Sequence, residues 1–255
     1  MKDLMKELEG MTLNPQSTPK PFNFFGLPYE LRLKVYDYLL LLPSTIDLDP
    51  SNYRTVAPKF RVFFVCHRMH EETYRVFYGR NTFRLFPIHG RFFNHKKPLL
   101  ARLPPRYIAA ITRLELRLGP GWNKPGRGWV VDERLQLQHA VKVRVLRIFV
   151  EMDPASTTYG MILGSWRVSP NFFTGFSVGL VRRVVAEIGS LRDVEMDTWD
   201  SLDREGSPLL DALVEEAKVS GKTVTWVPEN KAVAKASSNE AVLSALRLVR
   251  VSVRE

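Results

Sequence analysis

The densest group of chemically reactive side chains lies between residues 66 and 72, where Cys66, His67, His70, Glu71 and Glu72 occur together. In a helix, Cys66 and His70 would share one face, as a nucleophile with its base or as two metal ligands. The sequence HEET at His70 lacks the second histidine of a zinc-protease motif, and a helical cysteine has no evident oxyanion donor. We therefore expect a core cysteine with solvated neighbours, and neither a catalytic group nor a metal site.

Acidic side chains gather near residue 195. Five carboxylates follow one another there at short spacing: Asp193, Glu195, Asp197, Asp200 and Asp203. The first three alternate along a predicted strand and would share one face, where their oxygens could hold magnesium or calcium. Arg113, Arg117 and Arg147 lie on neighbouring predicted strands. Cross-strand ion pairs are therefore favoured over a cation site.

The segment 119–128, GPGWNKPGRG, follows a predicted strand, as a phosphate-binding loop would. It lacks both the Gly-Lys-Ser/Thr ending and the GxGxxG spacing, so we expect no nucleotide and no other cofactor. Its aromatic and basic residues could bind an acidic or extended peptide, could stack on single-stranded nucleic acid, or could pack back onto the fold. With two residues of a predicted strand face, they make up the candidate partner-binding set: Trp122, Lys124, Arg127, Trp129, Arg147 and Phe149.

Short strands and helices must position these side chains. Alternating apolar and polar residues predict strands over 82–86, 112–118, 143–152, 193–198 and 223–227, and helices over 171–188 and 208–220. Strands that alternate with helices imply βαβ units and a parallel sheet. The spacing is too irregular for a strict repeat, so the predicted class is α/β, with an irregular leucine-rich-repeat-like parallel β/α layer over 91–229.

The period of two assigns each strand residue to one of two sheet faces. The apolar set belongs in the core: Leu114, Leu116, Leu118, Leu146, Ile148, Val150, Val194 and Met196. The other set is polar and mixed in charge: Arg113, Glu115, Arg117, Arg147, Phe149, Glu151, Asp193, Glu195 and Asp197. Such a face is expected to meet water or a partner, because a sheet covered by helices on both sides would be apolar on both.

Residues 22–90 follow a helical pattern instead. An apolar stripe recurs at intervals of four residues: Leu27, Leu31, Val35 and Leu39. Pro28 suits a first helical turn and Pro43 ends the pattern. A second helix is predicted from Val62 to Phe77 with Gly79 as its C-terminal cap, and 43–59 is predicted to be a loop with one short extended piece. Residues 1–21 read as a flexible tail, and 230–255 as a linker and C-terminal helix.

Two of these segments together resemble the F-box-like proteins that are abundant in filamentous fungi. The first, FFGLPYELRLKVYDYLL at 24–40, resembles the F-box opening with Leu-Pro, an acidic residue and an aromatic-leucine end. The second, FFVCHRMHEETYRVFYGRNTFRLF at 63–86, resembles the helix of that family that ends in Tyr-Gly and Asn-Thr-Phe. The resemblance covers about residues 22–90.

This resemblance implies an N-terminal F-box-like helical module that binds the Skp-type adaptor of a cullin ubiquitin ligase, while the rest of the chain recruits a protein target. Carried over by position, the adaptor-binding residues are Leu27, Pro28, Leu31, Val35 and Leu39. Leucines spaced by four can fill apolar pockets of a partner groove. The alternative is that the stripe packs against the second helix. The segment 43–59 is longer than the usual F-box connection, so retention of adaptor binding is a separate question.

Composition limits the remaining function classes. With 255 residues, of which 45% are hydrophobic, the chain can bury a sizeable core. One cysteine excludes an internal disulfide and a multi-thiolate zinc site, and the sequence has no secretory or membrane-spanning pattern, so a cytoplasmic or nuclear protein is expected. The net charge of +10 is spread along the chain, which favours a generally basic surface. A nucleic-acid-associated binding protein is the alternative; an enzyme is not expected.

Overall fold

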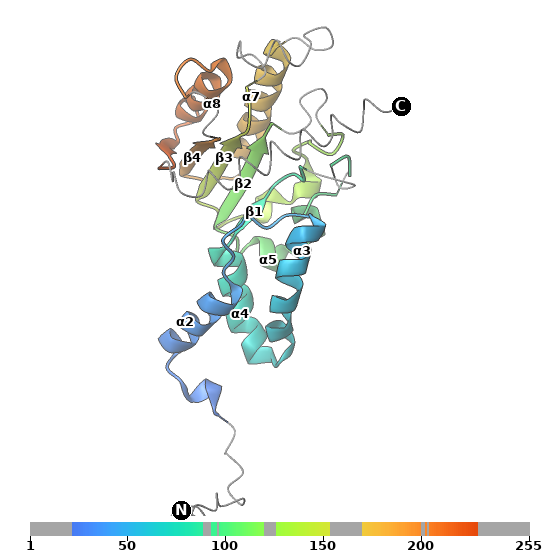
Figure 1. Ribbon diagram of the computed structural model, residues 1–255, viewed down its shortest axis with the longest axis vertical. Coiled ribbons are helices and arrows are strands. Elements are labelled where there is room, and N and C mark those ends of the chain that lie inside the picture. Colours follow the sequence, from blue (N-terminus) through green and yellow to red (C-terminus); the bar gives the residue numbers. More distant parts are fainter. Residues whose placement is uncertain are drawn as a thin grey trace, which may run out of the picture.

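The structure is a computed structural model that describes residues 22–88, 93–95, 97–119, 126–153, 170–199, 202 and 204–228. In chain order its elements are η1 (Phe24–Gly26), α2 (Tyr29–Leu40), α3 (Pro50–Val56), η2 (Ala57–Phe64), α4 (His67–Arg80), β1 (Thr82–Arg84), η4 (Leu100–Arg102), α5 (Pro105–Ile108), β2 (Arg113–Leu118), η5 (Glu133–Leu135), η6 (Leu137–His139), β3 (Val145–Val150), α7 (Pro170–Glu187), β4 (Asp193–Thr198), α8 (Pro208–Val219) and β5 (Thr223–Trp226). The helices α2 to α4 gather at one end of the molecule, and the sheet with α7 and α8 forms the other end (Figure 1).

The five strands form one parallel sheet in the order β1-β2-β3-β4-β5, so strands that follow one another in the chain are neighbours in space. The register places Arg84 beside Glu115, and Glu115 beside Arg147. All five strands and both helices predicted for this region are confirmed, with ends that differ by two residues or fewer. The chain is therefore a mixture of helices and a parallel sheet, as the α/β prediction requires.

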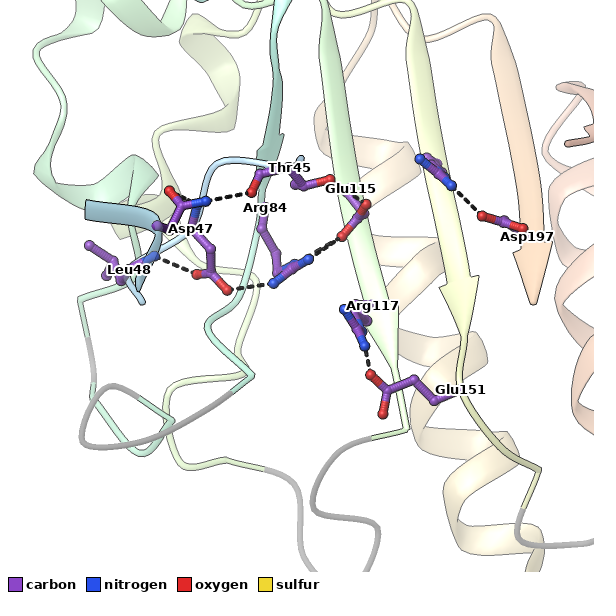
Figure 2. A network of polar contacts seen from close by, with 10 residues as sticks. Thr45, Asp47, Leu48, Arg84, Glu115, Arg117, Glu151 and Asp197 are labelled. Carbon is purple, nitrogen blue, oxygen red and sulfur yellow. Dashed lines mark hydrogen bonds and ion pairs between the residues drawn. The ribbon is translucent and has the colours of Figure 1, made fainter. Parts of the chain in front are cut away.

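The two faces of the sheet differ as the period of two predicts. The apolar side chains of β2, β3 and β4 are buried almost completely, for example Leu116, Ile148 and Met196 at 0% exposure. Helix α7 packs on α8, and α8 also contacts β5. The opposite face carries the charged side chains drawn in Figure 2. One layer of helices therefore covers the apolar face, and the polar face, which we call the open face, is covered in part by segment 45–47.

Helix α8 begins at a buried polar cap. The hydroxyl of Ser207 accepts the backbone N–H of Leu210 at 3.3 Å, and Pro208 occupies the first helical turn. Asp153, which follows β3 and is fully buried, accepts the Ser207 hydroxyl at 2.5 Å and the N–H of Leu209 at 3.1 Å. A carboxylate at a helix N-terminus is stabilised by the free N–H groups there. This contact holds α8 against the end of β3.

The N-terminal helices differ from the prediction in four ways. Helix α2 begins at Tyr29, with Pro28 as its N-cap, and not at Leu27. Helix α4 begins at His67, because 57–64 forms the separate 3₁₀ helix η2. Gly79 lies inside α4, and the helix is capped by Asn81. The expected loop 43–59 contains α3, although its short extended piece is present as a bridge from Ile46 to Phe83.

One continuous core joins the helical end to the sheet. Phe83 of β1 is 1% exposed, stacks on Tyr78 of α4 with ring centroids 5.4 Å apart, and lies beside Leu114 of β2 in the register. Tyr78 stacks in turn on Tyr107 at 4.8 Å. Strand β1 therefore belongs to both parts. The proposed domain boundaries at residues 21, 90 and 229 remain predictions.

Candidate functional site

Helix α2 uses a polar and aromatic face, and not its apolar stripe, to pack on α4. Arg32, Tyr36 and Leu40 are its buried residues. The Arg32 guanidinium binds both carboxylate oxygens of Glu72 at 2.9 Å, and the Tyr36 hydroxyl donates to the same carboxylate at 2.9 Å. A two-pronged arginine–carboxylate contact fixes orientation as well as distance. The position of α2 on α4 is therefore set by hydrogen bonds.

This contact shifts the acid-base behaviour of its members. The hydrogen bond from Arg32, with smaller contributions from Tyr36 and Arg68, lowers the pKa of Glu72 to about 2. Burial, followed by the hydrogen bond to the Glu72 carboxylate, raises the pKa of Tyr36 above its usual range. Both directions favour an ionised Glu72 beside a neutral Tyr36 at neutral pH.

The opposite end of α2 is held by Asn81. Its side-chain oxygen accepts the N–H of Leu42 at 2.9 Å, and its amide donates to the carbonyls of Leu40 at 3.0 Å and Phe77 at 2.9 Å. Arg80 also forms an ion pair with Asp37. The buried amide of Asn81 therefore joins the C-terminal ends of α2 and α4, and α2 is anchored at both of its ends.

Three of the five predicted adaptor-binding residues lie on the outer side of α2, and the other two precede the helix. Leu31, Val35 and Leu39 are 45%, 37% and 42% exposed. Pro28 is exposed and Leu27 is half-buried. The alternative, in which this stripe packs against the second helix, is wrong, because the packing face is the row Arg32, Tyr36 and Leu40. The structure leaves the stripe available for a partner.

Sequence reasoning missed one residue of this surface. Tyr38, 89% exposed, lies two turns from Leu31 and one turn from Val35 and widens the apolar side of α2. It also missed Arg32, Tyr36 and Glu72 as the packing residues. In the sequence, the only indication that these residues of α2 form the packing face is that Arg32, Tyr36 and Leu40 also recur at intervals of four. Hydropathy ranks that row below the apolar stripe, so the pattern favours the wrong face for packing.

The reactive cluster at 66–72 has structural roles. Cys66 is exposed and its sulfur accepts the N–H of Met69 at 3.4 Å, as the N-cap of α4, so the expectation of a core cysteine is wrong. The imidazole of His70 lies 3.2 Å from the carbonyl of Phe63 and 3.1 Å from the hydroxyl of Tyr107. Within the described residues, no group of histidine, cysteine or acidic side chains could hold a metal ion.

The open face of the sheet carries a connected set of ion pairs (Figure 2). Arg84 lies at its centre and contacts Asp47 at 2.6 Å and Glu115 at 2.7 Å. The Thr45 hydroxyl donates to the other oxygen of Glu115 at 2.6 Å. Segment 45–47, which comes from the helical end, is thereby fixed against the sheet.

Further ion pairs join neighbouring parts of this face: Arg113 with Glu195, Arg117 with Glu151, and Arg147 with Asp197. The prediction that the acidic residues of β4 form cross-strand ion pairs is confirmed for Glu195 and Asp197. Asp200 and Asp203 lie outside the described residues. These arginines and carboxylates therefore neutralise one another across the strands.

A groove of about 470 Å³ opens over this face, between segment 43–55 and strands β1 to β3. Among its lining residues are Arg84, Glu115, Arg117, Arg147 and Phe149. Two of the predicted partner-binding residues, Arg147 and Phe149, thus contribute to one hollow on the polar face. Sequence reasoning missed Arg117 as a third member, although its place in the alternation of β2 marks it as a residue of the same face.

The glycine-rich loop contributes less than predicted. Trp129 is 6% exposed, stacks on Phe86, and donates its indole N–H to the carbonyl of Pro87 at 3.2 Å. It belongs to the core, and its assignment to a partner surface is wrong. Gly126 is required there, because a Cβ would lie 2.5 Å from the carbonyl oxygen of Phe93. Arg127 is exposed, while Trp122 and Lys124 lie outside the described residues.

No helix among the described residues is long and apolar enough to cross a membrane. The chain was also compared with family models, with curated proteins and with solved structures, and none of these comparisons gave a match.

Proposed function

We propose that the chain is an F-box-like interaction protein that binds a Skp-type adaptor and recruits a protein target to a cullin ubiquitin ligase. The observation that carries the proposal is the outer side of α2, where the apolar side chains Leu31, Val35 and Leu39 are 37–45% exposed on a helix anchored through its other face. A helix on the surface of a globular protein normally turns such an apolar stripe toward the protein core. An apolar stripe that faces outward therefore supports the proposal that a partner binds there.

The mode of binding would be a helix lying in an apolar groove of the adaptor. Side chains at i, i+4 and i+8 lie in a row along a helix, so Leu31, Val35 and Leu39 can enter successive pockets. Fully burying an aliphatic side chain contributes about 1.5–3 kcal/mol, and these three are already partly shielded, so each contributes less. The hydrogen bonds of Arg32 and Asn81 keep α2 ordered before it binds, which reduces the entropy lost on association.

The second part of the proposal concerns the target. The sheet lies at the other end of the molecule from α2 (Figure 1), and Leu31, Val35 and Leu39 do not line the groove, so both surfaces could be occupied at once. In this proposal the chain performs no chemistry itself, and ubiquitin transfer would belong to the assembled ligase. The groove over β1 to β3 is the place where a target segment would bind.

The test is the affinity of the purified full chain for a purified Skp-type adaptor, measured by calorimetry. The double variant Leu31→Asp, Val35→Asp places two charges in the apolar stripe and is expected to lose at least 100-fold in affinity. The matched control is Lys34→Asp, an exposed residue of the same helix, which changes the net charge by the same −2.

Circular dichroism must show that both variants are folded. Binding by the intact chain and by Lys34→Asp, but not by the double variant, would support the proposal. The proposal fails if the intact chain does not bind the adaptor, or if the double variant binds as tightly as the control.

A further inference from the structure

Two carboxylates that line the groove, Glu115 and Asp47, already accept hydrogen bonds from within the protein. Glu115 accepts Arg84 on one oxygen and the Thr45 hydroxyl on the other. Asp47 accepts Arg84 on one oxygen and the N–H of Leu48 at 2.6 Å on the other. Each oxygen of these two groups therefore already accepts a hydrogen bond from within the protein.

Two arginines of the same groove are not satisfied. Arg117 donates through its Nε to Glu151, and Arg147 donates through one terminal nitrogen to Asp197. Both side chains are partly exposed, at 23% and 35%, and the Nε of Arg147 is buried with no acceptor among the described residues. A guanidinium carries five N–H donors, and a buried donor without a partner costs free energy. The groove therefore has surplus donors.

The guanidinium of Arg117 is held in place by aromatic rings. The Arg117 guanidinium lies 5.0 Å from the ring centre of Phe149 and 5.9 Å from that of Trp199. Stacking on an aromatic face orients a guanidinium while its edge remains free for a planar acceptor. A carboxylate is such an acceptor, and it can accept two parallel N–H groups at once.

We propose that this groove binds a carboxylate-bearing peptide segment, an Asp or Glu side chain of the target, through Arg117 and Arg147. The inference rests on the proposed function for its choice of a protein ligand. The donors and their geometry stand independently of it. Glu151 contacts Arg117, Asp197 contacts Arg147, and Glu115 lies beside Arg147, so a singly charged carboxylate meets less repulsion than a doubly charged phosphate would.

The experiment selects peptides from a displayed random 12-residue library on the purified full chain. Each enriched peptide is then synthesised with a fluorescent label and its affinity is measured by polarisation. The groove variant is Arg117→Gln, Arg147→Gln. The control is Arg113→Gln, Arg192→Gln, which removes the same charge from two exposed arginines that do not line the groove.

The enriched peptides are expected to contain an Asp or Glu whose replacement by the amide lowers affinity at least tenfold, equivalent to about 1.4 kcal/mol. The groove variant should lose a similar factor and the control should lose none. The amide substitution needs no change in the protein, so it gives a result even if the groove variant does not fold.

Three results would overturn the inference: no peptide enriched on the intact chain, enriched peptides insensitive to the amide change, or tighter binding when phosphoserine replaces the acid. The adaptor measurement separates the two proposals. The groove variant should keep adaptor binding and the α2 double variant should keep peptide binding. If the adaptor does not bind but acidic peptides do, the proposed function fails and the groove assignment stands.

Discussion

At the scale of single residues, the Glu72 side chain joins three donors at the α2–α4 contact. It accepts Arg32, Tyr36 and Arg68, and its side chain is 13% exposed. Carboxylates with this many donors are stabilised in the charged form. The candidate adaptor surface therefore depends on a residue that does not belong to it.

We expect Glu72→Gln to lower the free energy of unfolding at pH 7 by about 2–3 kcal/mol. Since the folded-state pKa is lowered from 4.5 to about 2, this stabilisation is complete above the unfolded-state pKa and is lost as pH falls from about 4.5 to about 2. Urea denaturation of both proteins at pH 2.5, 4, 5.5 and 7 measures it. The matched control is Glu71→Gln, whose partner Arg106 is exposed, and it should change stability much less. Equal losses for the two variants would contradict the assignment.

At the scale of elements, α7 contains a buried polar atom that has no hydrogen-bond partner among the described residues. Ser177 is 0% exposed and its hydroxyl is unsatisfied. It lies on the face of α7 that carries Leu180, Val181 and Val184 toward the core. A hydroxyl in such a place is desolvated without compensation.

We expect Ser177→Ala to raise the free energy of unfolding by about 0.5–1 kcal/mol, because it removes the unsatisfied hydroxyl and improves helix propensity. The control is Ser190→Ala, since the Ser190 hydroxyl lies 3.0 Å from the carbonyl of Ala140 and 2.7 Å from that of Val143. That change should lower stability by about 1 kcal/mol. Thermal and urea unfolding measure both. A loss of stability in Ser177→Ala would mean that the hydroxyl has a partner.

At the scale of the whole molecule, strand β1 makes the helical end and the sheet parts of one core. Phe83 packs between Tyr78 and Phe77 of α4 on one side and the neighbouring strand β2 on the other. A protein with one contiguous core is expected to unfold cooperatively. The two proposed binding surfaces would then be held in one fixed arrangement.

Phe83→Ala is expected to lower the free energy of unfolding by about 3–5 kcal/mol and to weaken both ends together. Hydrogen exchange followed by mass spectrometry can report α4 and β3 separately. Protection of both elements should fall by the same factor. Faster exchange in α4 with unchanged exchange in β3 would mean that the two ends are independent domains. The conservative control is Phe83→Leu, which keeps most of the buried volume and should have a smaller effect.

The strands and the two C-terminal helices could be predicted from the sequence, because period and burial coincide there. Every second residue of β2 and β3 is apolar, as are Val194 and Met196 of β4, and one face of the sheet is covered by helices, so the alternation itself encodes the fold. The pairing of Glu195 and Asp197 with arginines follows from the same alternation, since residues of one face are neighbours across strands.

Only the tertiary structure decided which face of α2 is buried and which residues border the groove. Hydropathy ranks Leu31, Val35 and Leu39 above Arg32 and Tyr36, but an arginine can be buried when a distant residue supplies a two-pronged carboxylate, and that residue is Glu72, 40 positions later in the chain. Trp129 likewise becomes a core residue because Phe86 and Pro87 lie beside it. Local patterns record the hydrophobicity of each residue and not the partners that folding brings to it. The sequence therefore determined the strands and the two C-terminal helices, and the tertiary contacts determined the surfaces.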